Sequence, residues 1–135
     1  MIAGLLAGGA MNMVFVYINI RLFPPPDGLS IFDPEAVKSG AMQAYLATLP
    51  FAAVLMVLVA HLSQTFVGGW VVGRLGVSHF TVLAMIIAVL SMIGGAMNMM
   101  DIPLPAWMWV EQPLYVLTAW WGMRVARRNK ALPVT

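Results

Sequence analysis

Residues 80–100, FTVLAMIIAVLSMIGGAMNMM, decide the fold class, because this run contains no charged side chain. An α-helix rises 1.5 Å per residue, so the run is about 31 Å long as a helix, and the hydrocarbon core of a bilayer is about 30 Å thick. Asp101 and Pro103 follow directly. We therefore expect residues 80–100 to form a membrane-spanning helix.

Three other stretches have the same apolar character and length, at residues 2–23, 51–72 and 105–126. Of all 135 residues, 61% are hydrophobic and 9% are charged, whereas soluble domains carry about a quarter charged residues. No basic residue precedes the first stretch and no small-residue cleavage site follows it, so we read it as a retained span rather than a signal peptide. The sequence predicts an all-α polytopic membrane protein, in which residues 1–135 form a single transmembrane domain of four transmembrane helices in a bundle.

Composition also argues against several functions. The net charge of +2 comes from seven basic and five acidic residues, too few for a surface that binds nucleic acid. The chain has no cysteine, and it has no phosphate-binding glycine loop, H-E-x-x-H or G-x-S-x-G motif. We expect no enzymatic activity, no metal and no cofactor, and we interpret the twelve methionines as apolar side chains rather than copper ligands.

Charge differs between the two sides of the predicted bundle. Arg74 lies between the second and third stretches, and four basic residues follow the fourth. The acidic residues all belong to the connections after the first and third stretches: Asp27, Asp33, Glu35, Asp101 and Glu111. Cytoplasmic loops of membrane proteins are rich in Lys and Arg. We therefore expect a multi-pass protein of the bacterial cytoplasmic (inner) membrane with both termini in the cytoplasm.

The connection at residues 24–49 is the only sizeable segment outside the predicted spans. Pro24–Pro26 predict an extended exit from the first helix, because each proline disfavours helix at the residue before it. Asp33-Pro34 is typical of an N-cap followed by proline at the first helical position. We expect a short interfacial helix between spans one and two, from Pro34 through Leu46.

Small residues predict close helix packing and hint at a repeat. Gly4 with Gly8, and Gly69 with Gly73, are spaced four apart, which lets helix backbones approach each other. The sequence Gly-Gly-Ala-Met-Asn-Met occurs twice, at residues 8–13 and 94–99. A duplicated two-helix hairpin and chance recurrence both remain open.

Polar side chains within the spans form the candidate site, because such side chains are costly at bilayer depth. Counting along the helices places His61 and Gln64 near the midplane, on one face of their helix. The other members of the predicted site lie in the outer third: Arg21, Asn98, Asp101 and Glu111.

Glu111 is the most informative of these. If the fourth span begins at Pro105, this carboxyl group lies more than one turn inside the helix, and Pro113 kinks the helix just beyond it. A buried carboxylate has to be protonated, hydrated or paired. We expect Arg21 to be its partner, with Asp101 as the second choice. A structural ion pair and an outward-facing polar vestibule are both compatible with this pattern.

Several short motifs point to a family. They are Leu22-Phe23-Pro24-Pro25-Pro26, Leu49-Pro50, Gly68-Gly69-Trp70-Val71-Val72, Asn98 and Ile102-Pro103-Leu104-Pro105-Ala106-Trp107. Together they resemble a family of small bacterial four-span integral membrane proteins to which no activity is assigned. The resemblance implies the fold and a bacterial origin, and it assigns no functional residue.

Three functions are compatible with these features. The first is a non-catalytic homo-oligomer or accessory subunit, with the lipid bilayer and a membrane subunit as partners. The second is a minimal transporter or a proton or cation conductor with an outer polar vestibule. The third is a haem- or metal-binding redox subunit that uses His61. Convergence of Arg21, His61, Asn98 and Glu111 on one cavity would favour the second.

Overall fold

The computed structural model of the chain describes residues 1–30, 33–38, 40–102 and 104–131. Its elements, in chain order, are α1 (Ile2–Leu22), α2 (Pro34–Lys38), α3 (Ala41–Thr48), α4 (Phe51–Leu75), α5 (Phe80–Asp101), the 3-10 helix η1 (Ala106–Val110) and α6 (Glu111–Ala131). The described residues contain no strand, so the predicted all-α class is confirmed. Pro103 of the proline-rich turn lies outside the described residues, as do the side chains of Val37, Lys38 and Lys130.

Three of the described helices, α1, α4 and α5, are long and apolar enough to cross a membrane. Each begins at the residue predicted from the sequence. The fourth predicted span does not belong to this group. Its helix, α6, begins with Glu111-Gln112 and carries Arg124, Arg127 and Arg128 near its end, so its apolar part is shorter.

The beginning of the fourth predicted span differs from our expectation. Residues Ala106–Val110 form a 3-10 helix, and the α-helix begins only at Glu111. Glu111 is therefore the first residue of α6 and does not lie a turn inside it. Pro113 falls in the first turn of α6, where a helix needs no N–H donor, so the kink predicted at this proline has no cause.

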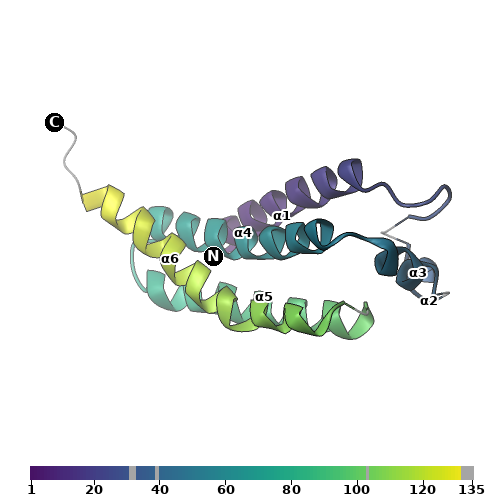
Figure 1. The fold of residues 1–135 in the computed structure, drawn as a ribbon. Helices are drawn as coiled ribbons and strands as arrows, with labels where there is room; N and C mark the ends of the chain where they lie inside the picture. The colour runs from purple at the N-terminus through teal and green to yellow at the C-terminus, as the bar shows by residue number, and fades with distance from the viewer. Residues whose placement is uncertain (31–32, 39, 103, 132–135) are drawn as a thin grey trace.

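Helix α4 lies at the centre of the bundle, between α1 and α6 (Figure 1). Helix α1 runs antiparallel to α4. A Cβ atom on Gly4 would lie 2.8 Å from the carbonyl oxygen of Gly68, and one on Gly8 would collide with the carbonyl of Gln64. Further along, Nδ2 of Asn19 donates a hydrogen bond of 3.2 Å to the carbonyl of Ala53.

Helix α6 runs parallel to α4 and packs just as closely. Gly69 lies against the backbone of Ala119, Gly73 against Met123, and Gly122 against Phe66. These contacts and those of α1 confirm that the Gly4/Gly8 and Gly69/Gly73 pairs bring helix backbones together.

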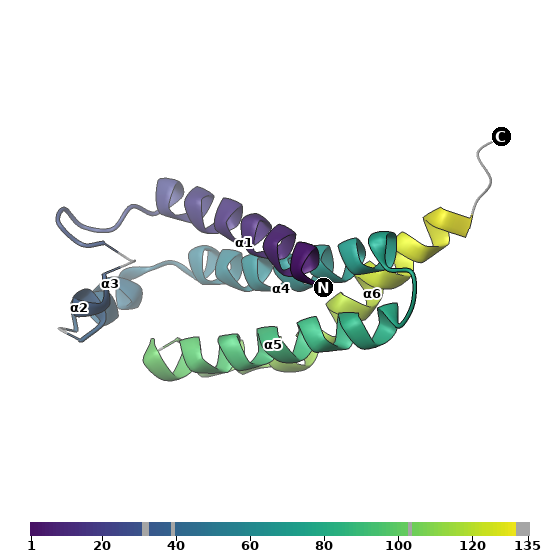
Figure 2. The ribbon, with the colours of Figure 1, turned by 180° about the vertical axis from the view of Figure 1, so that it is seen from behind.

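The two ends of the bundle differ. At the end bearing Arg74, Ile87 of α5 closes onto Gly4 and Gly68, so that α1, α4 and α5 meet. Toward the opposite end, which carries α2 and α3, α1 and α5 diverge on either side of α4 (Figures 1 and 2). We call this opposite end the α3 end.

The connection at the α3 end contains two short helices, α2 and α3, instead of the single helix expected. The predicted start at Pro34 is confirmed, and Oδ1 of Asp33 accepts a hydrogen bond of 3.0 Å from the backbone N–H of Glu35. Helix α3 begins after Gly40, whose φ of +76° lies in the left-handed region that a side chain disfavours. That turn separates the two helices.

Candidate functional site

A cavity of about 470 Å³ occupies the space where α1 and α5 diverge. Helix α4 forms its floor, and Met42, Tyr45 and Leu46 of α3 line its side at the α3 end. Cavities that bind small molecules have volumes of about 300–1,000 Å³. The space is therefore large enough for a small organic molecule.

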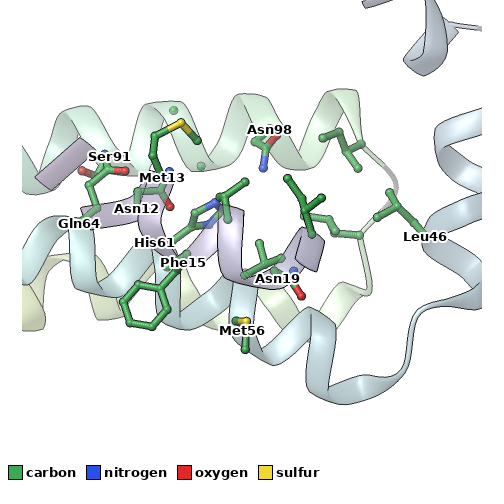
Figure 3. A pocket seen from close by; sticks show the side chains of 18 of the residues that line it. Asn12, Met13, Phe15, Asn19, Leu46, Met56, His61, Gln64, Ser91 and Asn98 are labelled. Carbon is green, nitrogen blue, oxygen red and sulfur yellow. The ribbon is translucent and has the colours of Figure 1, made fainter. Parts of the chain in front are cut away.

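The cavity combines apolar walls with polar side chains from three helices. The apolar part includes Phe15, Val16, Ile20, Met56 and Leu90. The polar side chains come in pairs from α1, α4 and α5, respectively: Asn12 and Asn19, His61 and Gln64, Ser91 and Asn98. Figure 3 shows them around one space, with the imidazole ring of His61 near its middle.

His61 is held in place by Glu111 of α6. Its Nδ1 lies 2.9 Å from Oε2 of Glu111, within hydrogen-bond and ion-pair distance. The Glu111 side chain is completely buried, whereas 15% of the His61 side chain is exposed. Glu111 therefore lies behind the cavity wall, and His61 stands between the carboxylate and the cavity.

The second oxygen of the Glu111 carboxylate, Oε1, lies beside Gly95 and the Tyr115 hydroxyl. This oxygen is buried and has no hydrogen-bond partner among the described residues. A Cβ atom on Gly95 would lie 2.8 Å from this oxygen and 2.6 Å from the hydroxyl of Tyr115. Gly95 and Tyr115 both line the cavity, so the carboxylate is separated from it by a single layer of residues.

The structure brings together part of the predicted site. His61, Gln64 and Asn98 line the cavity, and Glu111 joins them through His61. Arg21 and Asp101 are exposed and do not line it.

The expected Arg21–Glu111 pair is wrong. Nε of Arg21 donates a hydrogen bond of 3.1 Å to the Tyr17 hydroxyl on its own helix, and Glu111 pairs with His61 instead. Glu111 also shares the depth of His61 rather than lying nearer the outer end.

Sequence reasoning did not assign Tyr115, Asn12, Asn19 or Ser91 to the site. For Tyr115 a signal existed, because residues four apart share a helix face and Tyr115 follows Glu111 by four. The other three are ordinary polar residues within apolar helices. Only the packing of α1 and α5 around α4 shows that they line the same space.

The repeated Gly-Gly-Ala-Met-Asn-Met sequence has a mixed outcome. Its two asparagines, Asn12 and Asn98, line the same cavity from α1 and α5. The glycines differ, because Gly8 is buried against α4, whereas a Cβ atom on its counterpart Gly94 would have no other atom within 4 Å. The two copies therefore share a cavity but not a packing environment.

The chain matches no family model, no curated protein and no solved structure. The cavity and the residues around it therefore carry the evidence for function.

Proposed function

We propose that the chain is a four-span protein of the bacterial cytoplasmic membrane, with α1, α4, α5 and α6 crossing the bilayer. The charges at the two ends of the bundle support one orientation in the membrane. Arg74, Arg124, Arg127 and Arg128 gather toward one end of the bundle, and Asp27, Asp33, Glu35 and Asp101 toward the other. By the positive-inside rule, the arginine end and both termini face the cytoplasm.

In this orientation, α2 and α3 lie at the outer surface of the membrane. They are short, and most of their described side chains are exposed. Trp107 and Trp109 lie near the same end. Their side chains are exposed, as expected for aromatic residues at a bilayer interface.

We further propose that the protein is a minimal transporter whose binding site is the cavity. The single observation behind this proposal is the convergence of polar side chains from α1, α4 and α5 on one space, with the His61–Glu111 pair in its wall. Buried polar groups at bilayer depth are expensive and mark functional positions. The proposed solute is a small amphiphile, because most of the lining is apolar.

The rim of the cavity suggests how the solute enters. Met13, Leu90 and Gly94 line the cavity and are exposed on the surface between α1 and α5. In a bilayer this surface faces lipid, so an amphiphile can enter sideways. The Gly4–Gly68–Ile87 contact closes the bundle toward the arginine end.

The alternative proposal is a non-catalytic homo-oligomer or accessory subunit, which glycine-rich helix faces would favour. Gly4, Gly8, Gly69, Gly73 and Gly122 are all used in packing within the chain. They are not available for contacts with another subunit. Gly9 and Gly94 have no other atom within 4 Å of an added Cβ, so the alternative stays a proposal, and the convergence of polar side chains on the cavity is what favours transport.

A saturable binding experiment tests the cavity. The probe is 1-aminoanthracene, a neutral fluorescent amphiphile, added to the purified chain in detergent. Gly94→Phe should fill the rim without disturbing the fold, because no atom lies within 4 Å of the added Cβ. Gly9→Phe is the matched control, since Gly9 is equally open and does not line the cavity. We expect Gly94→Phe to weaken binding at least tenfold and Gly9→Phe to leave it unchanged. Equal binding by the unaltered chain and both variants would contradict the proposal.

A further inference from the structure

The charge of the cavity depends on one pair of residues. The described lining residues include one histidine, His61, and no Asp, Glu, Lys or Arg, and Glu111 lies directly behind His61. If Glu111 is ionised and His61 is neutral, the pair carries one negative charge. One additional proton makes the pair neutral overall, whether it resides on the imidazole or on the carboxyl group.

The other titratable groups near this pair do not change the net charge at the cavity. Tyr115 of α6 lies beside Glu111, and Tyr45 of α3 lines the cavity. Burial raises the pKa of Tyr45, so this hydroxyl stays neutral and donates a hydrogen bond of 2.6 Å to the carbonyl of Phe23. On α1, Tyr17 and Arg21 contact each other on the exposed surface, and Asp101 of α5 is exposed at the helix end. Arg74 lies in the last turn of α4, at the end of the bundle away from α3.

A single negative charge buried in apolar surroundings is unfavourable. Two things can neutralise it, the additional proton or a cation in the cavity. Both act on the same negative charge, so they compete. Occupation by a cation favours loss of the proton, and by linkage protonation weakens the binding of the cation to the same extent.

We propose that the solute is an organic cation with one positive charge and an apolar body, and that it binds in exchange for one proton from the His61–Glu111 pair. This inference rests on the proposed function and specifies its substrate class. When the cation enters, the proton leaves His61 or Glu111 and passes to water outside the protein. Nδ1–H of the neutral imidazole then donates to Oε2 of the ionised carboxylate, and total charge is conserved.

The walls favour an organic cation over a metal ion. Within the described part of the chain, no three His, Cys, Asp or Glu side chains lie close enough to hold a metal ion. The polar groups are instead neutral dipoles distributed around an apolar space. Ser91 Oγ, Asn12 Oδ1 and Asn19 Oδ1 are buried without a hydrogen-bond partner among the described residues. Such oxygen atoms can solvate a diffuse positive charge without displacing a hydration shell.

Two probes of similar size, one positively charged and one neutral, test the inference. Methyltriphenylphosphonium is a monovalent organic cation, and triphenylphosphine oxide is a neutral analogue of it. Titration calorimetry of the full chain in detergent, in buffers that differ in ionisation enthalpy, measures the protons released per molecule bound. We expect about one proton per phosphonium and none per oxide. Lowering the pH through the range in which the pair takes up its proton should raise the Kd for the phosphonium by up to about tenfold per pH unit, and the Kd for the oxide should not change.

Glu111→Gln should abolish proton release and the pH dependence. Asp101→Asn is the matched control, because it makes the same chemical change at an exposed acid outside the cavity. It should retain both properties. If Glu111→Gln fails to fold, the proton count and the comparison of the two probes on the unaltered chain still decide the question.

The outcomes separate this inference from the proposed function. Phosphonium binding without proton release, or equally tight binding of the oxide, overturns the inference. So does saturable binding of 1-aminoanthracene by a chain that does not bind the phosphonium, although the transport proposal then survives. Failure of all three compounds to bind saturably overturns the proposed function as well.

Discussion

Nδ1 of His61 and Oε2 of Glu111 lie 2.9 Å apart, and this contact joins two parallel helices through side chains that are 50 residues apart in the sequence. Around it, α4 and α6 make contacts at almost the same offset, including Gly69 with Ala119 and Gly73 with Met123. The pair is therefore part of the register that holds α4 and α6 together, besides its place in the cavity wall.

The pair should contribute to stability in a way that depends on which partner is removed. His61→Ala leaves a fully buried carboxylate without its partner, and breaking a buried pair in this way costs about 3–5 kcal/mol in soluble proteins. We expect His61→Ala to lower the unfolding free energy in detergent by about 3 kcal/mol. Adding Glu111→Met to His61→Ala should recover most of this loss. A double variant no more stable than His61→Ala would show that the charge is not the cause.

Gly8 and Gly9 provide a matched test of helix packing. An added methyl group at Gly8 collides with the Gln64 carbonyl, so Gly8→Ala should separate α1 from α4 and lower the melting temperature. At Gly9 nothing lies within 4 Å, and alanine is favoured over glycine in a helix by about 1 kcal/mol. Gly9→Ala should therefore leave stability equal or slightly higher. Thermal unfolding in detergent measures both, and equal effects would argue against the α1–α4 contact.

The hydroxyl groups of Thr65 and Thr118 connect α4 and α6 near the pair. Their Oγ1 atoms lie 2.7 Å apart, and Thr65 is completely buried. Hydrogen bonds between membrane helices contribute about 0.6 kcal/mol on average. We expect a double-mutant cycle of Thr65→Val and Thr118→Val to give a coupling energy of about that size. A coupling energy indistinguishable from zero would mean that each hydroxyl prefers the carbonyl of its own helix.

The proposed topology can be tested directly because the chain contains no cysteine. Val77, in the turn between α4 and α5, is 94% exposed, and Asp27, in the connection before α2, is also exposed. A membrane-impermeant maleimide added to intact bacteria should label Asp27→Cys. It should label Val77→Cys only after the membrane is permeabilised. The opposite pattern would reverse the orientation, and labelling of both in intact cells would contradict the proposed membrane arrangement.

Much of the helical structure could be predicted because it depends on local sequence. The starts of α1, α4 and α5 were predicted correctly, since an uncharged run and its flanking prolines or glycines are sufficient. The start of α6 was not. Pro105 and Pro113 suggested one helix with a kink, but Ala106–Val110 form the 3-10 helix η1, and α6 begins at Glu111.

The contacts within the site were harder to predict from the sequence. Glu111 could be recognised as a carboxyl group in need of a partner, but Arg21 was chosen because depth was counted along each helix separately. Whether His61 or Arg21 reaches Glu111 depends on the relative register and rotation of α4, α6 and α1. Those are set by glycine contacts between helices, which involve residues far apart in the chain.

Local patterns in the chain predicted an all-α protein with four spans, of which three helices are long and apolar enough to cross a membrane, and they identified which polar groups would be costly inside one. Hydrophobic run length, proline positions and charge act over a few residues, so they can be read directly. The packing of the helices against one another set the rest: α1 and α5 diverge to form a cavity, and His61, rather than Arg21, meets Glu111. Both outcomes follow from how closely backbones approach at Gly8, Gly69 and Gly73, because the fit between helices is a property of pairs of surfaces and not of either helix alone.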